Sequence, residues 1–349
     1  MIDQGVTVTV AAPGLDVDNQ VRKDLESLGA IAVDISLQRT GTNPIRDFGS
    51  LRHLYRLMRS SRPDVVLGYT IKPVVFGSLA GWLARVPRRY ALVTGLGYAF
   101  TGSRSGLLTV IIRRLYRLAL GTVDLVFFQN PDDEAFLRQK GILPAATPSF
   151  IVNGSGIDLV RYPVEPLPKT PVNFLMIARL LGDKGTREYV KAARQVRSRH
   201  PEIRCSLVGW IDDNPDAISQ SELDAWVEKG YVEYQGRLQD VRPAIADCSV
   251  YVLPSYREGT PRTVLEAMAM GRAIITSNAP GCRETVIDGQ NGFLVPVRSA
   301  EELADAMCRF VEDPELTIHM GRRSREIAEE KFDVRKVNAQ MLHEMGIGN

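Results

Sequence analysis

Residues 249–271 read SVYVLPSYREGTPRTVLEAMAMG, and this stretch decides the fold class. The run 249–253, rich in valine and closed by a proline, predicts a short buried strand. Thr260 and Pro261 predict the N-cap and the first position of a helix, because the N–H group that proline lacks has no helical partner there. Gly271 predicts the end of that helix. A buried strand joined by a loop to a helix is typical of α/β proteins.

Two glutamates flank the predicted start of this helix. Glu258 lies in the strand-to-helix loop, and Glu266 lies eight residues later in the second turn. The unpaired amides of a helix N-terminus favour an anion such as a phosphate, and the two carboxylates can accept hydrogen bonds from ligand hydroxyls. These features suit a sugar nucleotide. Glutamates at this spacing also occur by chance, so two solvated surface residues are the alternative.

Strands alternate with helices along the whole chain. Strands are predicted in the first half at 6–10, 31–35, 64–67, 90–94, 125–129 and 150–152, and helices at 17–28, 44–60, 77–84 and 107–120. In the second half strands are predicted at 172–178, 203–208, 231–235, 249–253 and 273–276, and helices at 186–199, 221–229, 263–270, 300–310 and 316–331. This alternation predicts two doubly wound parallel sheets. The proline-rich run 161–171 predicts a boundary between domains 1–165 and 166–331, followed by a C-terminal helix in 332–349 that packs back on the first domain.

Ligands of doubly wound sheets bind beyond the carboxyl ends of the strands, and the second domain places two cations there. Arg179 ends one predicted strand and Lys184 begins the next helix, with a glycine-bearing loop between them. Such a pair suits a diphosphate. Its loop is expected at the same sheet edge as the Glu258 loop. Two ordinary surface charges are the alternative.

In the first domain, the loops YTIKP and TGLGY follow predicted strands. Lys72, two residues after Thr70, can meet a diphosphate, and Gly95 and Gly97 can let backbone amides approach it closely. Alternatively, Lys72 is a solvated loop lysine and the glycines only make turns.

Positive charge is concentrated in the first domain. The chain of 349 residues has a net charge of only +2, but residues 1–165 carry +5 and the remainder carries −3. Residues 39–117 hold 14 basic residues against two aspartates. Such a positive field favours anionic partners. A nucleic-acid partner is not expected, because no basic motif with interleaved aromatic residues is present.

The predicted helix 107–120 places Arg113, Arg114 and Arg117 among leucines and isoleucines. A basic amphipathic helix can lie on an anionic membrane surface, and it can equally be a crossover helix with a charged outer face. The sequence has no uncharged apolar run long enough to span a bilayer and no visible signal peptide. We therefore expect a cytoplasmic protein held peripherally at the inner face of the plasma membrane.

The four cysteines and four histidines show neither paired nor metal-like spacing. This pattern predicts free thiols in a reducing compartment and no metal site. The neighbouring Asp212 and Asp213 are interpreted as part of a loop rather than as cation ligands.

The cation and glutamate motifs of the second domain, with the Ala-Met pair after Glu266, resemble the retaining glycosyltransferases of family 4. The resemblance covers nearly the whole chain and implies the GT-B architecture, in which two Rossmann-like domains face each other across a cleft. TIKP at 70–73 and TGLGYAF at 94–100 resemble the branch that builds lipid-linked bacterial glycans. Members of that branch add N-acetylhexosamine or related sugars to an undecaprenyl-diphosphate-linked acceptor.

The resemblance also implies roles for individual residues. Arg179 and Lys184 hold the donor diphosphate, and Glu266 binds the ribose hydroxyls of a UDP-sugar. The donor sugar is contacted by Glu258, Gly259, Thr260 and Pro261. The base lies near Gly236, Arg237 and Leu238, and Gly209 also belongs to the donor-binding residues. The acceptor side is formed by Thr70, Lys72, Gly95 and Gly97. No metal or other cofactor is implied. The leaving phosphate is expected to take the acceptor proton in a same-face substitution.

Two departures from the family pattern affect the first domain. Relatives generally begin with a strand, a glycine-rich loop and a helix before the element matching 6–10, so about 25–30 residues are absent by comparison. We therefore expect a first sheet without its central strand, from a truncated protein or a start codon assigned too far downstream. Many relatives also carry a histidine near the reacting sugar, where this chain offers Tyr69, Thr70 and Lys72.

Two other functions stay open from the sequence. A non-hydrolysing UDP-sugar epimerase has a similar architecture, but it is expected to need carboxylates and histidines in the cleft, and the scattered histidines give no support. An inactive sugar-nucleotide-binding partner subunit is suggested by the short N-terminus.

Overall fold

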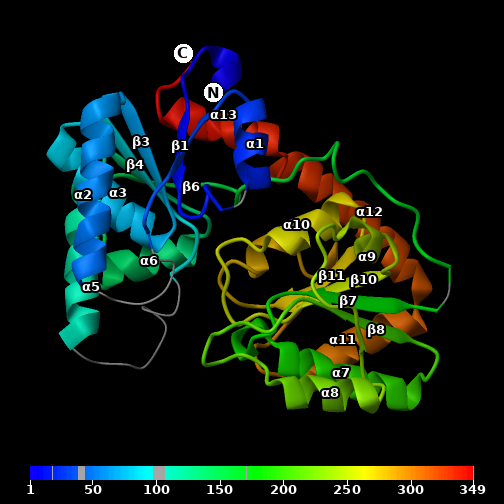
Figure 1. Cartoon of the computed structure of the whole chain (residues 1–349). Coiled ribbons are helices and arrows are strands. Elements are labelled where there is room, and N and C mark those ends of the chain that lie inside the picture. The colour runs from blue at the N-terminus through cyan, green and yellow to red at the C-terminus, as the bar shows by residue number, and fades with distance from the viewer. Residues whose placement is uncertain (18, 38–43, 97–106, 170, 349) are drawn as a thin grey trace. The chain divides into compact units, whose positions relative to one another are not determined.

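The computed structural model describes every residue except 18, 38–43, 97–106, 170 and 349 (Figure 1). The chain divides into two compact units. The first unit comprises Met1–Val152 with Ala339–Asn349, and the second comprises Asn153–Asn338. The boundary thus precedes Asn153, whereas the sequence predicts it near residue 165.

The first unit contains two parallel sheets. β3 (Val65–Tyr69), β4 (Arg88–Val93), β5 (Leu125–Phe128) and β6 (Ser149–Ile151) pair in that order, while β1 (Thr9–Ala12) pairs only with β2 (Ile31–Asp34). Its helices are α1 (Asn19–Ser27), α2 (Pro44–Ser61), α3 (Ile71–Ala84), α5 (Leu107–Leu120) and α6 (Pro131–Gln139). Within the described residues no ladder joins β1 to β3. β4 and β5 are buried at consecutive positions, as expected for parallel strands covered on both faces.

The turn between β3 and α3 corrects the predicted loop after residue 69. Only Thr70 separates the strand from the helix, so Lys72 is the second helical residue rather than a loop residue. Thr70 has a φ of 68°, a conformation that costs about 1–3 kcal/mol for a residue with a Cβ atom. Gly68 allows this tight turn, because a Cβ atom there would lie 2.8 Å from the carbonyl oxygen of Pro73.

The end of the chain binds the first unit. α13 (Val334–Glu344) is followed by a turn whose carbonyl groups meet β4. The Arg88 guanidinium donates to the carbonyl oxygens of Met345 and Gly346, both at 3.1 Å. The Tyr90 hydroxyl donates to the Met345 carbonyl at 2.9 Å. These bonds fix the last residues against a strand more than 250 residues earlier in the sequence.

The second unit is a doubly wound α/β domain with one six-stranded parallel sheet. The strand order is β12-β11-β10-β7-β8-β9. The strands are β7 (Asn173–Ile177), β8 (Arg204–Val208), β9 (Glu233–Tyr234), β10 (Val250–Leu253), β11 (Ala273–Ser277) and β12 (Gly292–Val295). The helices are α7 (Thr186–Arg199), α8 (Gln220–Glu228), α9 (Arg242–Ala246), α10 (Arg262–Ala269), α11 (Ala300–Glu312) and α12 (Pro314–Lys331). Figure 1 shows α7, α8 and α11 on one face of the sheet and α10 and α12 on the other.

Several sequence expectations need correction. α10 begins at Arg262, and its N-cap is Pro261 in an extended conformation, so the predicted start is one residue early. The sequence interpretation missed α6, α9 and β12. The four cysteines are free, as predicted, and all four are buried.

The proline-rich run belongs to the second unit because its beginning is bound there. Tyr162 is buried, and its hydroxyl donates to Glu266 at 2.9 Å. The fully buried Arg272 donates to the carbonyl oxygens of Glu165 and Pro166 at 2.8 and 3.1 Å. The proline-rich run therefore marks a segment that is bound to the second unit, rather than a free linker between the two units.

Arg272 also donates to the carbonyl oxygens of Ile245 and Ala246 at 2.9 and 3.0 Å, and burial lowers its pKa. We expect Arg272→Met to lower the free energy of unfolding by about 3 kcal/mol or more, because several buried carbonyl groups lose their donors. Urea unfolding followed by circular dichroism measures this effect. Arg204→Met is the matched control, since Arg204 makes exposed ion pairs worth about 0–1 kcal/mol. Equal losses in the two variants would contradict the role given to Arg272.

Candidate functional site

The strand order of the second unit creates a switch point between β7 and β10. From β7 the chain continues to β8 and β9 on one side, and from β10 it continues to β11 and β12 on the other. Ligands of open parallel sheets bind where the connections diverge in this way. Arg179 and Lys184 follow β7, and Glu258 follows β10. The predicted cations and the predicted loop glutamate therefore meet at the switch point.

Lys184 and Glu258 form an ion pair that links these two loops. Lys184 Nζ lies 2.5 Å from Glu258 Oε1, and both side chains are only 16% exposed. The contact depends on Gly185, whose φ is 73° and whose Cβ atom, if present, would lie 2.2 Å from the Pro254 carbonyl oxygen. Glycine at this position therefore allows the loop after β7 to lie directly against the loop after β10.

Arg179 is held by Asp212, a residue that the sequence interpretation left in a loop. Arg179 Nη1 donates to Asp212 Oδ2 at 2.8 Å, and the Asn214 amide donates to Asp212 Oδ1 at 3.1 Å. Arg179 is 44% exposed, so its guanidinium is open to a ligand. Both predicted cations thus have a carboxylate partner. The spacing of 33 residues between Arg179 and Asp212 gives no signal in the sequence.

The residues predicted near the base lie beside the loop after β8. The Gly209 amide donates to the Gly236 carbonyl at 2.9 Å, which brings the loops after β8 and β9 together. Arg237 lies over the indole ring of Trp210, with its guanidinium carbon 4.7 Å from the ring centroid. Trp210, which the sequence interpretation missed, is 39% exposed and offers an aromatic surface. Leu238 packs against the core of this unit.

Glu266 lies in the second turn of α10, as predicted, but it is buried rather than solvated. Its Oε1 accepts hydrogen bonds from the Tyr162 hydroxyl at 2.9 Å and from Arg262 Nε at 3.2 Å. Burial, and then the negative charge of Glu266, raise the pKa of Tyr162. A buried carboxylate with both of its bonds on one oxygen is unlike a surface residue placed by chance.

The loop between β10 and α10 is packed tightly from two sides. A Cβ atom on Gly281, whose φ is 82°, would lie 2.2 Å from the Glu258 carbonyl oxygen and 2.5 Å from that of Gly259. A Cβ atom on Gly154 would lie 2.9 Å from the Thr260 side chain. Three of the predicted donor-contacting residues, Glu258, Gly259 and Thr260, therefore lie in close contact with neighbouring backbone before the start of α10.

The acceptor-side residues predicted from the sequence belong to the first unit. Lys72 Nζ forms an ion pair with Asp47 Oδ1 at 3.0 Å on α2. Thr70 is the single residue between β3 and α3, and Gly95 has a φ of 126° after β4. Gly97 lies outside the described residues.

Comparisons with known proteins assign both units to one enzyme class. Residues 1–154 match the Glycosyl transferase 4-like domain, and residues 171–313 match Glycosyl transferases group 1. The N,N'-diacetylbacillosaminyl-diphospho-undecaprenol alpha-1,3-N-acetylgalactosaminyltransferase of Campylobacter jejuni is 28% identical over 322 residues, which cover 88% of this chain and 83% of that protein. The UDP-Gal:alpha-D-GlcNAc-diphosphoundecaprenol alpha-1,3-galactosyltransferase of Escherichia coli is 26% identical over 288 residues, covering 78% and 73%.

Among solved structures, that of Anabaena HepE in complex with UDP superposes with a TM-score of 0.76 at 17% identity, covering 98% of this chain and 100% of that chain. A glycosyltransferase from Rickettsia africae gives a TM-score of 0.76 at 16% identity, covering 99% and 90%. At this level of identity the likeness shows the fold, which is the GT-B architecture of two α/β units.

Proposed function

Because the chain belongs to the family-4 glycosyltransferases, with a 4-like domain followed by a group 1 domain, we propose that it moves a sugar from a UDP-sugar to an undecaprenyl-diphosphate-linked acceptor. The observation that carries the proposal is the convergence of Arg179, Lys184 and Glu258 at the switch point of the second unit. The names of both curated relatives specify diphospho-undecaprenol acceptors, and one specifies a UDP-sugar donor. The product then belongs to a cell-surface polysaccharide or glycan, with N-acetylhexosamine or a related hexose as the transferred sugar.

The donor diphosphate is the group that Arg179 and Lys184 are placed to bind. Each cation faces one carboxylate, Asp212 or Glu258. A diphosphate carries more negative charge than either carboxylate, so it can take over both cations at once. As the bond to the sugar breaks, further negative charge develops on the leaving phosphate, and fixed cations stabilise that charge. We propose that these cations, and no metal ion, neutralise the leaving group.

Release of Lys184 frees Glu258 for the donor sugar. Its carboxylate can then accept hydrogen bonds from sugar hydroxyls beside the start of α10. Glu266 uses Oε1 for Tyr162 and Arg262, which leaves Oε2 for the ribose hydroxyls. The exposed ring of Trp210, backed by Arg237, offers a stacking surface for the base.

We propose that transfer proceeds with retention of configuration. Both relatives' names specify an alpha product, which is the outcome of retention when the donor sugar is alpha-linked. In a same-face substitution the leaving phosphate takes the acceptor proton, so no separate protein base is required.

A lipid-linked acceptor stays at the bilayer, and we propose that α5 of the first unit meets that surface. Arg114 is exposed on it, and four apolar side chains on the same helix are between 38% and 56% exposed: Val110, Ile111, Leu115 and Leu118. Arg113 is only partly exposed, and Arg117 donates to the Gly141 carbonyl, so Arg114 is the arginine best placed for lipid. None of the helices in the described part of the chain is long and apolar enough to cross a bilayer.

We expect Lys184→Ala to raise the activation free energy of sugar transfer by about 2–4 kcal/mol, because the leaving group loses one fixed positive charge that stabilises it. Steady-state kinetics with radiolabelled UDP-N-acetylhexosamine and undecaprenyl-diphosphate-linked acceptor measures this, with thermal unfolding as the check on folding. Lys169→Ala, at an exposed lysine of the same unit, is the control. Unchanged turnover in Lys184→Ala would contradict the proposed role of Lys184 in stabilising the leaving group. Loss of activity in EDTA would contradict the proposed independence from metal.

We expect Glu266→Gln to weaken UDP binding by about 1–3 kcal/mol, because an amide replaces one oxygen acceptor with a donor in a buried hydrogen-bond network. Isothermal titration calorimetry with UDP measures the change. Tyr162→Phe is the matched control: it removes the Tyr162 bond to Glu266 but keeps the carboxylate. If Glu266→Gln binds UDP as tightly as the wild type does, Glu266 has only the structural role of holding Tyr162.

We expect the wild type to bind phosphatidylglycerol vesicles at low salt and to be released at high salt, since each basic residue near an anionic leaflet adds about 1 kcal/mol that salt screens. The variant Arg114→Gln/Leu115→Ser/Leu118→Ser should bind vesicles less while keeping its UDP affinity. Leu28→Ser, which changes an exposed leucine elsewhere in the first unit, is the control for lost apolar surface. Vesicle flotation that shows no wild-type binding would make a soluble acceptor the better hypothesis.

A further inference from the structure

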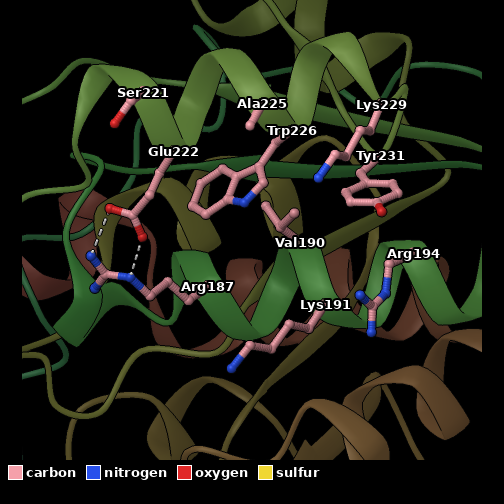
Figure 2. Close-up of a pocket in the computed structure, with 10 residues that line it drawn as sticks. All are labelled: Arg187, Val190, Lys191, Arg194, Ser221, Glu222, Ala225, Trp226, Lys229 and Tyr231. Atoms are coloured by element: carbon pink, nitrogen blue, oxygen red, sulfur yellow. Dashed lines mark hydrogen bonds and ion pairs between the residues drawn. The ribbon is translucent and has the colours of Figure 1, made fainter.

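A groove between α7 and α8 lies on the outer face of the second unit, and none of the donor residues lines it. Its volume is about 460 Å³. Side chains from both helices and from the segment after α8 line it: Arg187, Val190, Lys191, Arg194, Ala225, Trp226, with Lys229 and Tyr231 at one end (Figure 2). The α7 positions 187, 190, 191 and 194 repeat at helical spacing, so one face of the helix forms a wall about two turns long.

The floor of the groove is apolar. Val190 is 2% exposed, and Ala225 and Trp226 are partly exposed between the two helices. Figure 2 shows the indole of Trp226 and the side chain of Val190 facing each other between α7 and α8. Helices that leave an apolar strip of this kind between them accept an apolar side chain from a partner.

The two ends of the groove differ in charge. At one end Arg187 donates to both carboxylate oxygens of Glu222, at 2.9 and 3.1 Å, and this pairing lowers the pKa of Glu222 to about 2. At the other end stand Arg194 and Lys229, and Lys191 lies on α7 between Arg187 and Arg194 (Figure 2). None of these three cations forms an ion pair with a carboxylate in the described part of the chain. Arg194 only stacks on Tyr231, with its guanidinium carbon 5.9 Å from the ring centroid.

We propose that this groove docks an acidic amphipathic segment of a partner protein. An apolar side chain of the segment would lie on Val190 and Trp226, and its carboxylates would meet Lys191, Arg194 and Lys229. Charge complementarity favours this occupant, because the groove lining carries one carboxylate against four cations. The apolar floor is recessed between two helices, so an extended or helical peptide segment can reach it with its side chains. A flat bilayer surface would need an apolar patch that protrudes from the protein. α7 begins two residues after Lys184, so the docked segment would lie next to the donor loop.

The test is a selection of random peptides of about twelve residues, displayed on phage, with the whole chain as bait. Counter-selection uses the charge-reversed variant Lys191→Glu/Arg194→Glu/Lys229→Glu. All three positions are exposed, so the variant should fold and bind UDP like the wild type. We expect enriched peptides that combine several acidic residues with a leucine or an aromatic residue. Fluorescence anisotropy should give at least tenfold weaker binding to the charge-reversed variant and to Trp226→Ala.

A second charge reversal, Lys23→Glu/Lys140→Glu in the first unit, is the matched control and should leave peptide affinity unchanged. The proposal is overturned if selection enriches no acidic peptides, or if the enriched peptides bind the charge-reversed variant equally well. It is also overturned if the groove variant loses binding to phosphatidylglycerol vesicles instead, since the occupant is then lipid. A loss of self-association in that variant, measured by analytical ultracentrifugation, would make a second copy of this chain the occupant.

Discussion

The proposed donor site depends on one close backbone approach, between Gly185 and the carbonyl group of Pro254. A side chain at residue 185 would separate the loop after β7 from the loop after β10. Without that approach, Lys184 and Glu258 would not meet, and the cations that follow β7 would lie apart from the start of α10. The strand order places both loops at one sheet edge, but the missing Cβ atom is what lets them touch.

Patterns in the sequence predicted most of the fold because each buried parallel strand is a short apolar run followed by a helical period. Most of the predicted strands and helices match within a few residues. α6 was missed although its signal is strong: Asn130 accepts from the Asp133 amide, and Pro131 opens the helix. β12 was missed because four residues beginning with a glycine carry no periodic pattern.

The site residues divide by the kind of signal they leave in the sequence. Arg179, Lys184 and Glu258 are placed by topology, so their convergence was predictable once the strands were known. Two of the partners that hold site residues were not predictable: Asp212, which accepts from Arg179, and Tyr162, which donates to Glu266, come from irregular segments whose path only the folded chain defines. The predicted boundary near residue 165 differs from the division before Asn153 for the same physical reason. Hydrogen bonds to buried groups keep the beginning of the proline-rich run on the second unit.

The balance of charge at the donor site has a consequence for selectivity. Arg179 and Lys184 each pair with one carboxylate, Asp212 or Glu258, so each of the two positive charges is balanced locally. A ligand with one phosphate can compete for one cation but leaves the other ion pair intact. In the proposed donor complex a diphosphate spans both cations, and each carboxylate that it displaces becomes available for hydroxyl groups. In the proposed donor site the two cations therefore favour a nucleoside diphosphate over a monophosphate because only the diphosphate contacts both, while the ion pairs set where the two cations stand.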